Sequence, residues 1–308
     1  MVTHDLPSLK AQLIKIADCA VKSDEALAPY TSYNIGGPAT LWVAPETEDA
    51  VANALGIIHA SKAPLFILGR GSNLLISDRG WPGVTLYLGE NLNGWDMQDT
   101  EARVLAGTLL MDLIHAAVAN GLGGMELMAG IPGGVGGALR MNAGAFGQEI
   151  ESATLSVKGY STDGEPFEMA RSEIDFSYRR VPALEQKVIT SGRFGFNREK
   201  TPLLKERMQD ILRLRTQKQP LEYPSCGSVF KRPPGYYAGA LIQEAGLRGE
   251  RIGGAMVSEK HSGFILNVDD ATAADVHALI CRIEERIKER FGVTLEREVK
   301  LIGEFEKE

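Results

Sequence analysis

The chain has 308 residues and is 44% hydrophobic and 24% charged, which is ordinary for a globular protein of two or three domains. Its formal net charge of −7 excludes a nucleic-acid binder that depends on overall charge. No stretch approaches the roughly 20 apolar residues that span a bilayer, and the first residues lack the apolar run of a signal peptide.

The cysteines and histidines indicate neither a disulfide framework nor a metal site. Cys19, Cys226 and Cys281 are odd in number and widely scattered, which is typical of a reducing compartment. The five histidines form no pair at metal-ligand spacing. We therefore expect a cytoplasmic protein with no metal, no nucleic-acid partner and no membrane partner.

The N-terminal part predicts the opening of an α/β unit: a helix over 5–22, a strand over 41–43, a helix capped by Thr47 and a buried strand over 65–68. Residues 69–73 then begin like a dinucleotide-binding fingerprint, but Leu74 stands where the third glycine should be. Because residues 74–77 look like a strand, this sequence lacks the helix N-terminus that a Rossmann fold requires at this point. We expect instead a tight strand–turn–strand connection that presents N–H groups to phosphate.

The segment from Gly121 to Gly147, called here the glycine-rich segment, holds ten of the 34 glycines. A flexible linker would be polar, whereas this segment interleaves its glycines with methionine, leucine, isoleucine and valine. Glycine at this density suits a place where something approaches the main chain closely, and bare N–H groups suit phosphate oxygens. The pattern predicts a buried, rigid cradle.

The central part predicts short strands between residues 85 and 106, a helix over 112–120, and strands over 153–160, 166–169 and 188–196. Phe176-Ser177-Tyr178-Arg179-Arg180 is an aromatic and basic cluster. As a strand it would place Arg179 and Arg180 on opposite faces, so that one of them points inward. A basic helix over 203–218, with a solvated charged face, joins two domains, and we place a boundary near residue 215.

The last third predicts a helix over 238–245, a strand over 263–268, and a long helix that begins with a capping box of Thr272 and Asp275. The inward stripe of that long helix is Val276, Leu279, Ile280, Ile283 and Ile287. A final strand over 295–301 would alternate, with Leu295, Val299 and Leu301 on one face and Glu296, Glu298 and Lys300 on the other.

Seven sequence blocks follow one another along nearly the whole chain. They are Asn34 to Gly37, GRGSNLL (69–75), GIPGGVGGALRMNAGAFG (130–147), FSYRRV (176–181), YPSCGSVFKRP (223–233), KHSGFILN (260–267) and EREVKLIG (296–303). In this order they resemble the UDP-N-acetylenolpyruvoylglucosamine reductases, flavoenzymes of bacterial peptidoglycan synthesis. The compact stretch between Tyr178 and the 223 block resembles the type II branch, which lacks an inserted substrate-covering loop.

The resemblance implies an α+β chain: an FAD-binding domain of the vanillyl-alcohol-oxidase (PCMH) type, made of two α/β subdomains, and a smaller C-terminal α+β substrate domain. We expect the first subdomain at 1–63 with 300–308, the second at 64–214, and the substrate domain at 215–299. FAD is expected to be non-covalent, because no histidine or cysteine stands at an obvious linking place. By position, FAD would be held by Gly69, Arg70, Gly71, Ser72, Asn73, Leu74, Gly130, Ile131, Pro132, Gly133, Gly134, Gly137, Ala138, Asn142, Ala143 and Gly144.

The family reaction reduces UDP-N-acetylglucosamine enolpyruvate to UDP-N-acetylmuramate. NADPH passes a hydride to FAD, flavin N5 delivers it to C3 of the substrate, and C2 is then protonated. Such a step needs a positioned acid and stabilisation of the developing negative charge. By their match to the family, Ser228 is the proton donor, Arg179 neutralises the enolate carboxylate and Glu298 supports the enol intermediate.

The resemblance also assigns Tyr178, Lys231 and Arg232 to the substrate, although Arg232 departs from the small polar residue common in relatives. His261 is expected to be structural. Cys226 is expected to be incidental packing, with a possible sensitivity to thiol reagents.

Purely structural explanations of the same residues also remain open. Ser228 could cap a turn, Glu298 could be a solvent-facing residue paired with Lys300, and Arg180 is the adjacent alternative to Arg179. Two other functions also remain open: an FAD-dependent sugar or alcohol oxidase of the same fold, and a non-catalytic module that binds a nucleotide sugar. We expect a monomer in each case.

Overall fold

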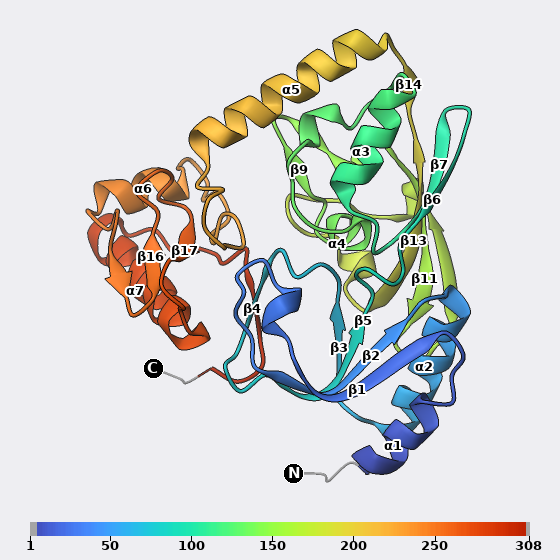
Figure 1. Cartoon of the computed structure of the whole chain (residues 1–308). Helices are drawn as coiled ribbons and strands as arrows, with labels where there is room; N and C mark the ends of the chain where they lie inside the picture. The colour runs from blue at the N-terminus through green and yellow to red at the C-terminus, as the bar shows by residue number, and fades with distance from the viewer. Residues whose placement is uncertain (1–4, 306–308) are drawn as a thin grey trace. The chain divides into compact units, whose positions relative to one another are not determined.

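The computed structural model describes residues 5–305 (Figure 1). Residues 1–4 and 306–308, which include both ends of the predicted first subdomain, lie outside the described residues. The chain forms two compact units. The first comprises Met1–Ser23, Thr40–Arg70 and Gly83–Arg215, and the second comprises Asp24–Ala39, Gly71–Pro82 and Thr216–Glu308.

Both units contain α-helices and β-strands, and Figure 1 labels most of them. The α-helices are α1 (Leu6–Leu13), α2 (Glu48–Ser61), α3 (Leu110–Ala119), α4 (Val135–Arg140), α5 (Thr201–Lys218), α6 (Ala238–Glu244) and α7 (Ala273–Phe291). The strands are β1 (Cys19–Ala26), β2 (Pro38–Pro45), β3 (Leu65–Leu68), β4 (Leu74–Ile76), β5 (Trp81–Tyr87), β6 (Trp95–Gln98), β7 (Glu101–Leu105), β8 (Leu122–Gly123), β9 (Gly144–Ala145), β10 (Gln148–Glu149), β11 (Thr154–Ser161), β12 (Pro166–Ala170), β13 (Lys187–Gly195), β14 (Asn197–Arg198), β15 (Arg251–Ile252), β16 (Ala255–Val257), β17 (Ile265–Asn267) and β18 (Lys300–Ile302).

The first unit begins with the predicted strand–helix–strand arrangement. Thr47 caps α2, because its side chain accepts a 3.1 Å hydrogen bond from the N–H of Ala50. The helix leads to β3, which pairs in parallel with β5 in a sheet of order β1-β2-β5-β3. The connection that makes this parallel pairing possible is residues 69–80, which contain β4 and no helix.

The predicted helix over residues 5–22 is wrong beyond Leu13. Helix α1 ends there, Asp18 adopts a left-handed backbone conformation with φ of 53°, and β1 begins at Cys19. The helical spacing of Leu9, Leu13 and Ile16 is real, but pairing with β2 decides the conformation of the following residues. Sheet pairing at this point overrides a local periodicity.

A second, antiparallel sheet of order β12-β11-β13-β7-β6 forms the other half of the first unit. Helix α4 packs against β13 and β7. The unit's core is a continuous set of buried apolar side chains that includes Val104, Leu139 and Phe194. The glycine-rich segment, which contains α4, is therefore anchored on this sheet.

The second unit has its own core, built around α7. As predicted, Thr272 and Asp275 form a capping box, and Val276, Leu279, Ile280, Ile283 and Ile287 are all buried. Asp78 adds a second cap, because its carboxylate accepts the N–H groups of Ala273 and Ala274 at 2.8 and 3.0 Å. The antiparallel sheet β15-β16-β17 packs against the helix.

The last predicted strand is only partly regular. Leu295 and Val299 are buried and Glu296 is exposed, as the alternation predicted, but regular strand is confined to β18, which pairs in parallel with β4. Before it, Arg297 forms an isolated bridge with Phe230. Residues 295–299 are thus held by contacts with several separate segments and not by one continuous strand pairing.

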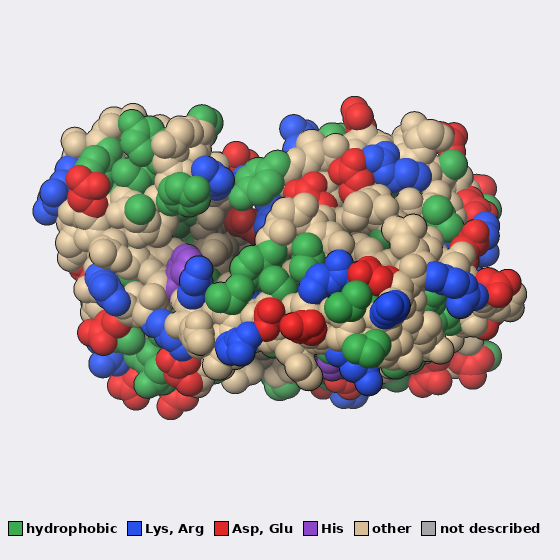
Figure 2. All heavy atoms as spheres, turned by 90° about the horizontal axis from the view of Figure 1, so that it is seen from above, with side chains coloured by type: hydrophobic (Ala, Val, Ile, Leu, Met, Phe, Trp, Pro, Cys, Tyr) green, Lys and Arg blue, Asp and Glu red, His purple; other side chains and the backbone are tan. Residues whose placement is uncertain are grey.

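The face of the molecule drawn in Figure 2 carries both signs of charge. Figure 2 shows Lys and Arg side chains interspersed with Asp and Glu side chains over the face that it draws. Within residues 5–305, no helix combines the length and the apolar character that crossing a membrane requires.

Candidate functional site

The glycine-rich segment runs across the end of β7 with its main chain in direct contact with the strand's continuation. The N–H groups of Val135 and Gly136 donate to the carbonyls of Thr108 and Ala106 at 2.9 and 2.8 Å. A Cβ at Gly134 would lie 2.8 Å from the carbonyl oxygen of Ala106, so a side chain does not fit there. This contact explains the buried, rigid character that the composition predicted.

Other glycines of the two predicted cofactor turns border open space, and this space shows whether the main chain there is accessible to a cofactor. A Cβ built at Gly137 or at Gly69 would meet no atom within 4 Å. Gly137 is exposed and Gly69 half-buried. Gly130 and Gly133, with φ of 80° and 107°, turn the segment in a way that other residues rarely adopt. Unshielded main chain bordered by glycine turns is what a diphosphate requires, so these residues fit FAD.

Residues predicted to hold FAD divide into accessible and buried ones. Gly130, Ile131, Pro132, Gly133 and Gly144 are half-buried or exposed, whereas Gly134, Ala138, Asn142 and Ala143 are buried. Only the accessible main chain can meet a ligand directly.

Arg70 is fixed by two partners in the first unit. Its Nε donates to the carbonyl of Gly107 at 2.9 Å, and its Nη1 pairs with the carboxylate of Glu90 at 3.2 Å. Its side chain is only 15% exposed, whereas that of Glu90 is 74% exposed. Arg70 thus provides a held cation beside Gly69.

Arg179 and Arg180 lie in a tight turn and not in a strand, so the expected alternation does not apply. Ser177 and Arg180 exchange main-chain hydrogen bonds of 2.9 and 3.2 Å, and Arg179 has a left-handed φ of 55°. The guanidinium of Arg179 donates to the carbonyls of Asn142 and Gly144 at 3.3 and 2.8 Å. Arg180 instead pairs with Glu185 at the surface. The turn therefore directs the two cations to different surroundings.

Asn142 is fully buried, and its side chain faces the protein. Its amide nitrogen donates to the carboxylates of Glu149 and Glu151 and to the carbonyl of Ser177, at 2.8 to 3.3 Å. Through these bonds it joins the glycine-rich segment to the turn that carries Arg179. This link was missed from the sequence, because it depends on contacts 35 residues apart.

In the second unit, Gly71 is a position that only glycine can occupy. Its φ is 61°, and a Cβ would lie 2.1 Å from the carbonyl oxygen of Tyr30. Beyond Ser72, the main chain of Asn73 and Leu74 enters β4, which pairs with β18. Residues 71–74 are therefore a tight turn into a strand, as predicted.

Ser228 and Glu298 lie on two segments that are joined through Val229. The carbonyl of Val229 accepts the N–H groups of Glu298 and Val299 at 2.8 and 3.3 Å. Ser228 itself bridges to Phe264 and follows Gly227, whose φ is 81°. Both Ser228 and Glu298 are half-buried. The main chain thus holds a hydroxyl and a carboxylate on adjoining segments.

Two cations follow Ser228 along the chain. Lys231 Nζ pairs with the exposed carboxylate of Glu296, and its side chain is only 14% exposed. Arg232 stacks on the ring of Tyr237, with its guanidinium carbon 4.0 Å from the ring centre. Tyr178, the third residue predicted for substrate, belongs to the first unit and is half exposed.

His261 and Cys226 have structural surroundings within the second unit. His261 Nδ1 accepts the N–H of Gly263 at 3.2 Å, and burial lowers the pKa of this histidine. Cys226 is buried, and burial raises the pKa of its thiol to about 12. A buried, protonated thiol reacts slowly, so the expected sensitivity of Cys226 to thiol reagents is not supported.

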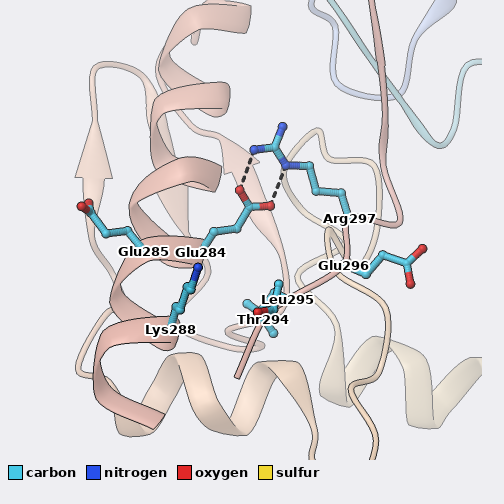
Figure 3. Close-up of a pocket in the computed structure, with 7 residues that line it drawn as sticks. All are labelled: Glu284, Glu285, Lys288, Thr294, Leu295, Glu296 and Arg297. Carbon is cyan, nitrogen blue, oxygen red and sulfur yellow. Dashed lines mark hydrogen bonds and ion pairs between the residues drawn. The ribbon is translucent and has the colours of Figure 1, made fainter. Parts of the chain in front are cut away.

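A surface pocket of about 560 Å³ beside α7 contains none of the predicted site residues (Figure 3). Figure 3 shows Arg297 turned toward Glu284 and Glu296 turned away from it. Arg297 binds Glu284 through Nε and Nη2 at 2.6 and 2.5 Å. This two-point pair fixes the residue before Glu298 on α7. The alternation of Leu295 and Val299, which includes Arg297 on the inward face, was the signal that could have found it.

Two known families match parts of the chain. Residues 39–169 match an FAD binding domain, and residues 219–302 match the C-terminal domain of UDP-N-acetylenolpyruvoylglucosamine reductase. The predicted combination of an FAD-binding domain with a C-terminal α+β domain is therefore confirmed.

Relatives match over nearly the full length. The UDP-N-acetylenolpyruvoylglucosamine reductase of Listeria innocua is 43% identical over 96% of this chain and 99% of its own. That of Clostridioides difficile is 40% identical over 92% and 94%. The crystal structure of the Thermus caldophilus enzyme covers 92% of this chain and 99% of its own, at 34% identity and a TM-score of 0.79. This chain belongs to the UDP-N-acetylenolpyruvoylglucosamine reductase family.

Proposed function

We propose that this protein reduces UDP-N-acetylglucosamine enolpyruvate to UDP-N-acetylmuramate in peptidoglycan precursor synthesis, with FAD as its bound cofactor and NADPH as the reductant. Relatives named for this reductase match more than nine-tenths of the chain. The observation that carries the proposal is the pair of bonds from Val229, which keeps Ser228 and Glu298 on adjoining segments. A hydroxyl and a carboxylate on adjoining segments are groups that the protonation of a carbanion can use.

FAD, when bound, supplies the chemistry of hydride transfer from NADPH to the vinyl carbon C3 of the substrate. The protein's part is to hold the diphosphate through the main chain of residues 69–73 and 130–138. The open space at Gly69 and Gly137 and the held guanidinium of Arg70 support that role. No residue is required to form a covalent bond to the cofactor.

Arg179 is proposed to bind the substrate carboxylate next to C2. A guanidinium has five N–H donors in a planar fork, which can meet both oxygens of a carboxylate. The two main-chain carbonyls that hold Arg179 fix the plane of this fork. Arg180 is the weaker candidate, because the turn directs it to Glu185 and not to the glycine-rich segment.

Ser228 is proposed to give its Oγ proton to C2 after hydride has added to C3. Addition at C3 leaves an electron pair at C2 that is delocalised into the carboxylate, and Arg179 stabilises that charge. A serine hydroxyl is a weak acid, so the transfer requires a basic carbanion and a carboxylate that orients the hydroxyl. Glu298 is proposed to be that carboxylate.

Lys231 is proposed to bind the diphosphate of the nucleotide sugar. Its present partner, Glu296, is exposed and can give way to a more highly charged group. Arg232 would act from its stacked position on Tyr237.

The test is an assay with purified protein and FAD. NADPH oxidation should depend on UDP-N-acetylglucosamine enolpyruvate, and the product should have gained two hydrogens by mass spectrometry. Rapid reaction of reduced protein with oxygen, without reduction of the enolpyruvyl substrate, would favour the oxidase. A colourless protein that binds only the nucleotide sugar would favour the binding module. The monomeric state and the cytoplasmic location stay predictions, the first open to light scattering.

A further inference from the structure

Asn73 ends the turn of residues 71–73, but its side chain is engaged by the second unit itself. Its amide nitrogen donates a 3.0 Å hydrogen bond to the main-chain carbonyl of Glu298. Its own carbonyl accepts the N–H of Lys300 at 3.1 Å. The pairing continues into β4 and β18, where Leu74 lies opposite Lys300. Asn73 therefore holds residues 298–300 through two hydrogen bonds.

The other side of Glu298 is held by the segment that carries Ser228. Its N–H donates to the carbonyl of Val229 at 2.8 Å, and the preceding residue, Arg297, is fixed on α7 by Glu284. Both main-chain polar groups of Glu298 thus have named partners, one on each side. These two bonds fix the backbone of Glu298 and therefore the direction of its Cα–Cβ bond.

We propose that Asn73 is a positioning residue. Its side-chain amide holds Glu298 in the position from which it acts with Ser228, and so couples the phosphate-binding turn of residues 71–73 to that carboxylate. The role of Glu298 rests on the function proposed above. The phosphates are then met by main-chain N–H groups of the turn, and the Asn73 side chain is not a ligand of the cofactor. Binding of FAD to residues 71–73 should in turn order residues 298–300.

The physical cost of losing this bond is small for folding and large for catalysis. One hydrogen bond between half-buried groups contributes little to overall stability. A displacement of about 1 Å in a catalytic group, in contrast, can slow a reaction about 100-fold. Removal of the Asn73 amide should therefore produce a stable protein with a misplaced Glu298.

The experiment compares Asn73→Ala and Asn73→Ser with Asn120→Ala. Asn120 is a matched control, because its amide also donates to a main-chain carbonyl, that of Ala116 at 2.8 Å, at an exposed helix end. The affinity of the apoprotein for FAD is measured by flavin fluorescence. Reduction by NADPH and reoxidation by the enolpyruvyl substrate are measured separately by anaerobic stopped flow. Hydrogen exchange of residues 298–300 is followed with and without FAD.

For both Asn73 variants we expect FAD affinity and reduction by NADPH within about twofold of wild type, and reoxidation slowed at least about tenfold. In the wild type, FAD should slow hydrogen exchange at residues 298–300, and this effect should be lost in the variants. In a Glu298→Ala background, Asn73→Ala should slow reoxidation no further, because both changes act through one group.

Weakened FAD binding with normal reoxidation would overturn the proposal and make the Asn73 side chain a cofactor ligand. Additive effects of Asn73→Ala and Glu298→Ala would also overturn it. Failure of the wild type to reduce the enolpyruvyl substrate would instead refute the proposed function. The hydrogen-exchange comparison would still test the link between Asn73 and residues 298–300.

Discussion

The guanidinium of Arg179 donates a 2.8 Å hydrogen bond to the main-chain carbonyl of Gly144, within the glycine-rich segment. Arg180, its neighbour in sequence, turns instead to the carboxylate of Glu185 at 3.0 Å. Two adjacent arginines are thus separated by the turn in which they lie, and only Arg179 is tied to the segment proposed to hold the cofactor.

This separation predicts unequal effects of two lysine substitutions. Arg179→Lys keeps the charge but loses the fork that meets both carboxylate oxygens, so kcat/KM for the enolpyruvyl substrate should fall about 10- to 100-fold. Arg180→Lys, the matched control, should stay within about twofold. Steady-state kinetics of both variants provide the check, and the reverse order of effects would reassign the carboxylate-binding residue.

Ser228→Ala should impair the reduction of the substrate and leave the reduction of FAD intact. The change removes the hydroxyl proton proposed for C2 but leaves the hydrogen bonds of Val229 unchanged. Reduction of bound FAD by NADPH should stay within about twofold, while reoxidation by the enolpyruvyl substrate should fall about 100- to 10,000-fold. Stopped-flow absorbance at the flavin band separates the two steps. Equal losses in both would exclude Ser228 as the proton donor.

Local patterns predicted most of the helices and strands. The α7 stripe and its capping box depend on residues three or four positions apart, so the sequence shows them directly. The end of α1 could not be found in this way, because β1 owes its conformation to pairing with β2. Residues 295–299 were likewise assigned to a strand. In the structure, Arg297 makes only an isolated bridge with Phe230, and its side chain binds Glu284 on α7.

For the candidate site, the residues named from the sequence stay predictions, and the sequence did not show the connections between them. Glycine density and motif order marked the cofactor turns, the arginine pair and Ser228. The bond from Asn73 to Glu298 joins residues 225 positions apart and has no local signature. The turn at Arg179 was also hidden, because alternation assumes an extended strand and the residue has a left-handed φ of 55°.

Gly137→Ala should affect the cofactor and leave the fold intact. A Cβ at this position meets no atom within 4 Å, and alanine favours a helix by up to about 1 kcal/mol. The free energy of unfolding of the apoprotein should therefore be unchanged or slightly higher. Affinity for FAD should fall about tenfold or more, because the methyl group occupies space that the cofactor approaches. Urea unfolding and FAD titration measure the two quantities; unchanged affinity would remove Gly137 from the cofactor site.

Gly71→Ala should have the opposite pattern. Its Cβ would lie 2.1 Å from the carbonyl oxygen of Tyr30, and its φ is 61°. The clash and the left-handed backbone should lower the free energy of unfolding by at least about 2 kcal/mol. Urea unfolding of the apoprotein checks this without reference to activity. A fully stable variant would show that the turn can shift to accept a side chain.

The buried thiol of Cys226 predicts a loss of stability at alkaline pH. Burial raises its pKa to about 12, while the thiol of the unfolded chain ionises near its ordinary pKa of about 8.5. Above that ordinary value the unfolded state binds fewer protons than the folded state, so the free energy of unfolding falls as pH rises from about 9 to 12. By pH 10.5 this one group should cost roughly 3 kcal/mol.

Cys226→Ala provides the comparison, because it removes the titrating group and little volume. Urea unfolding of both proteins at pH 8 and pH 10.5 should show a shallower loss in the variant, although the variant starts less stable at pH 8. The native wild type at pH 8 should also leave Cys226 unmodified by a thiol reagent until urea unfolds it, since reaction requires an accessible thiolate. Parallel losses with pH in the two proteins, or rapid modification in the native state, would show that the thiol is reached by water and that its burial does not govern its ionisation.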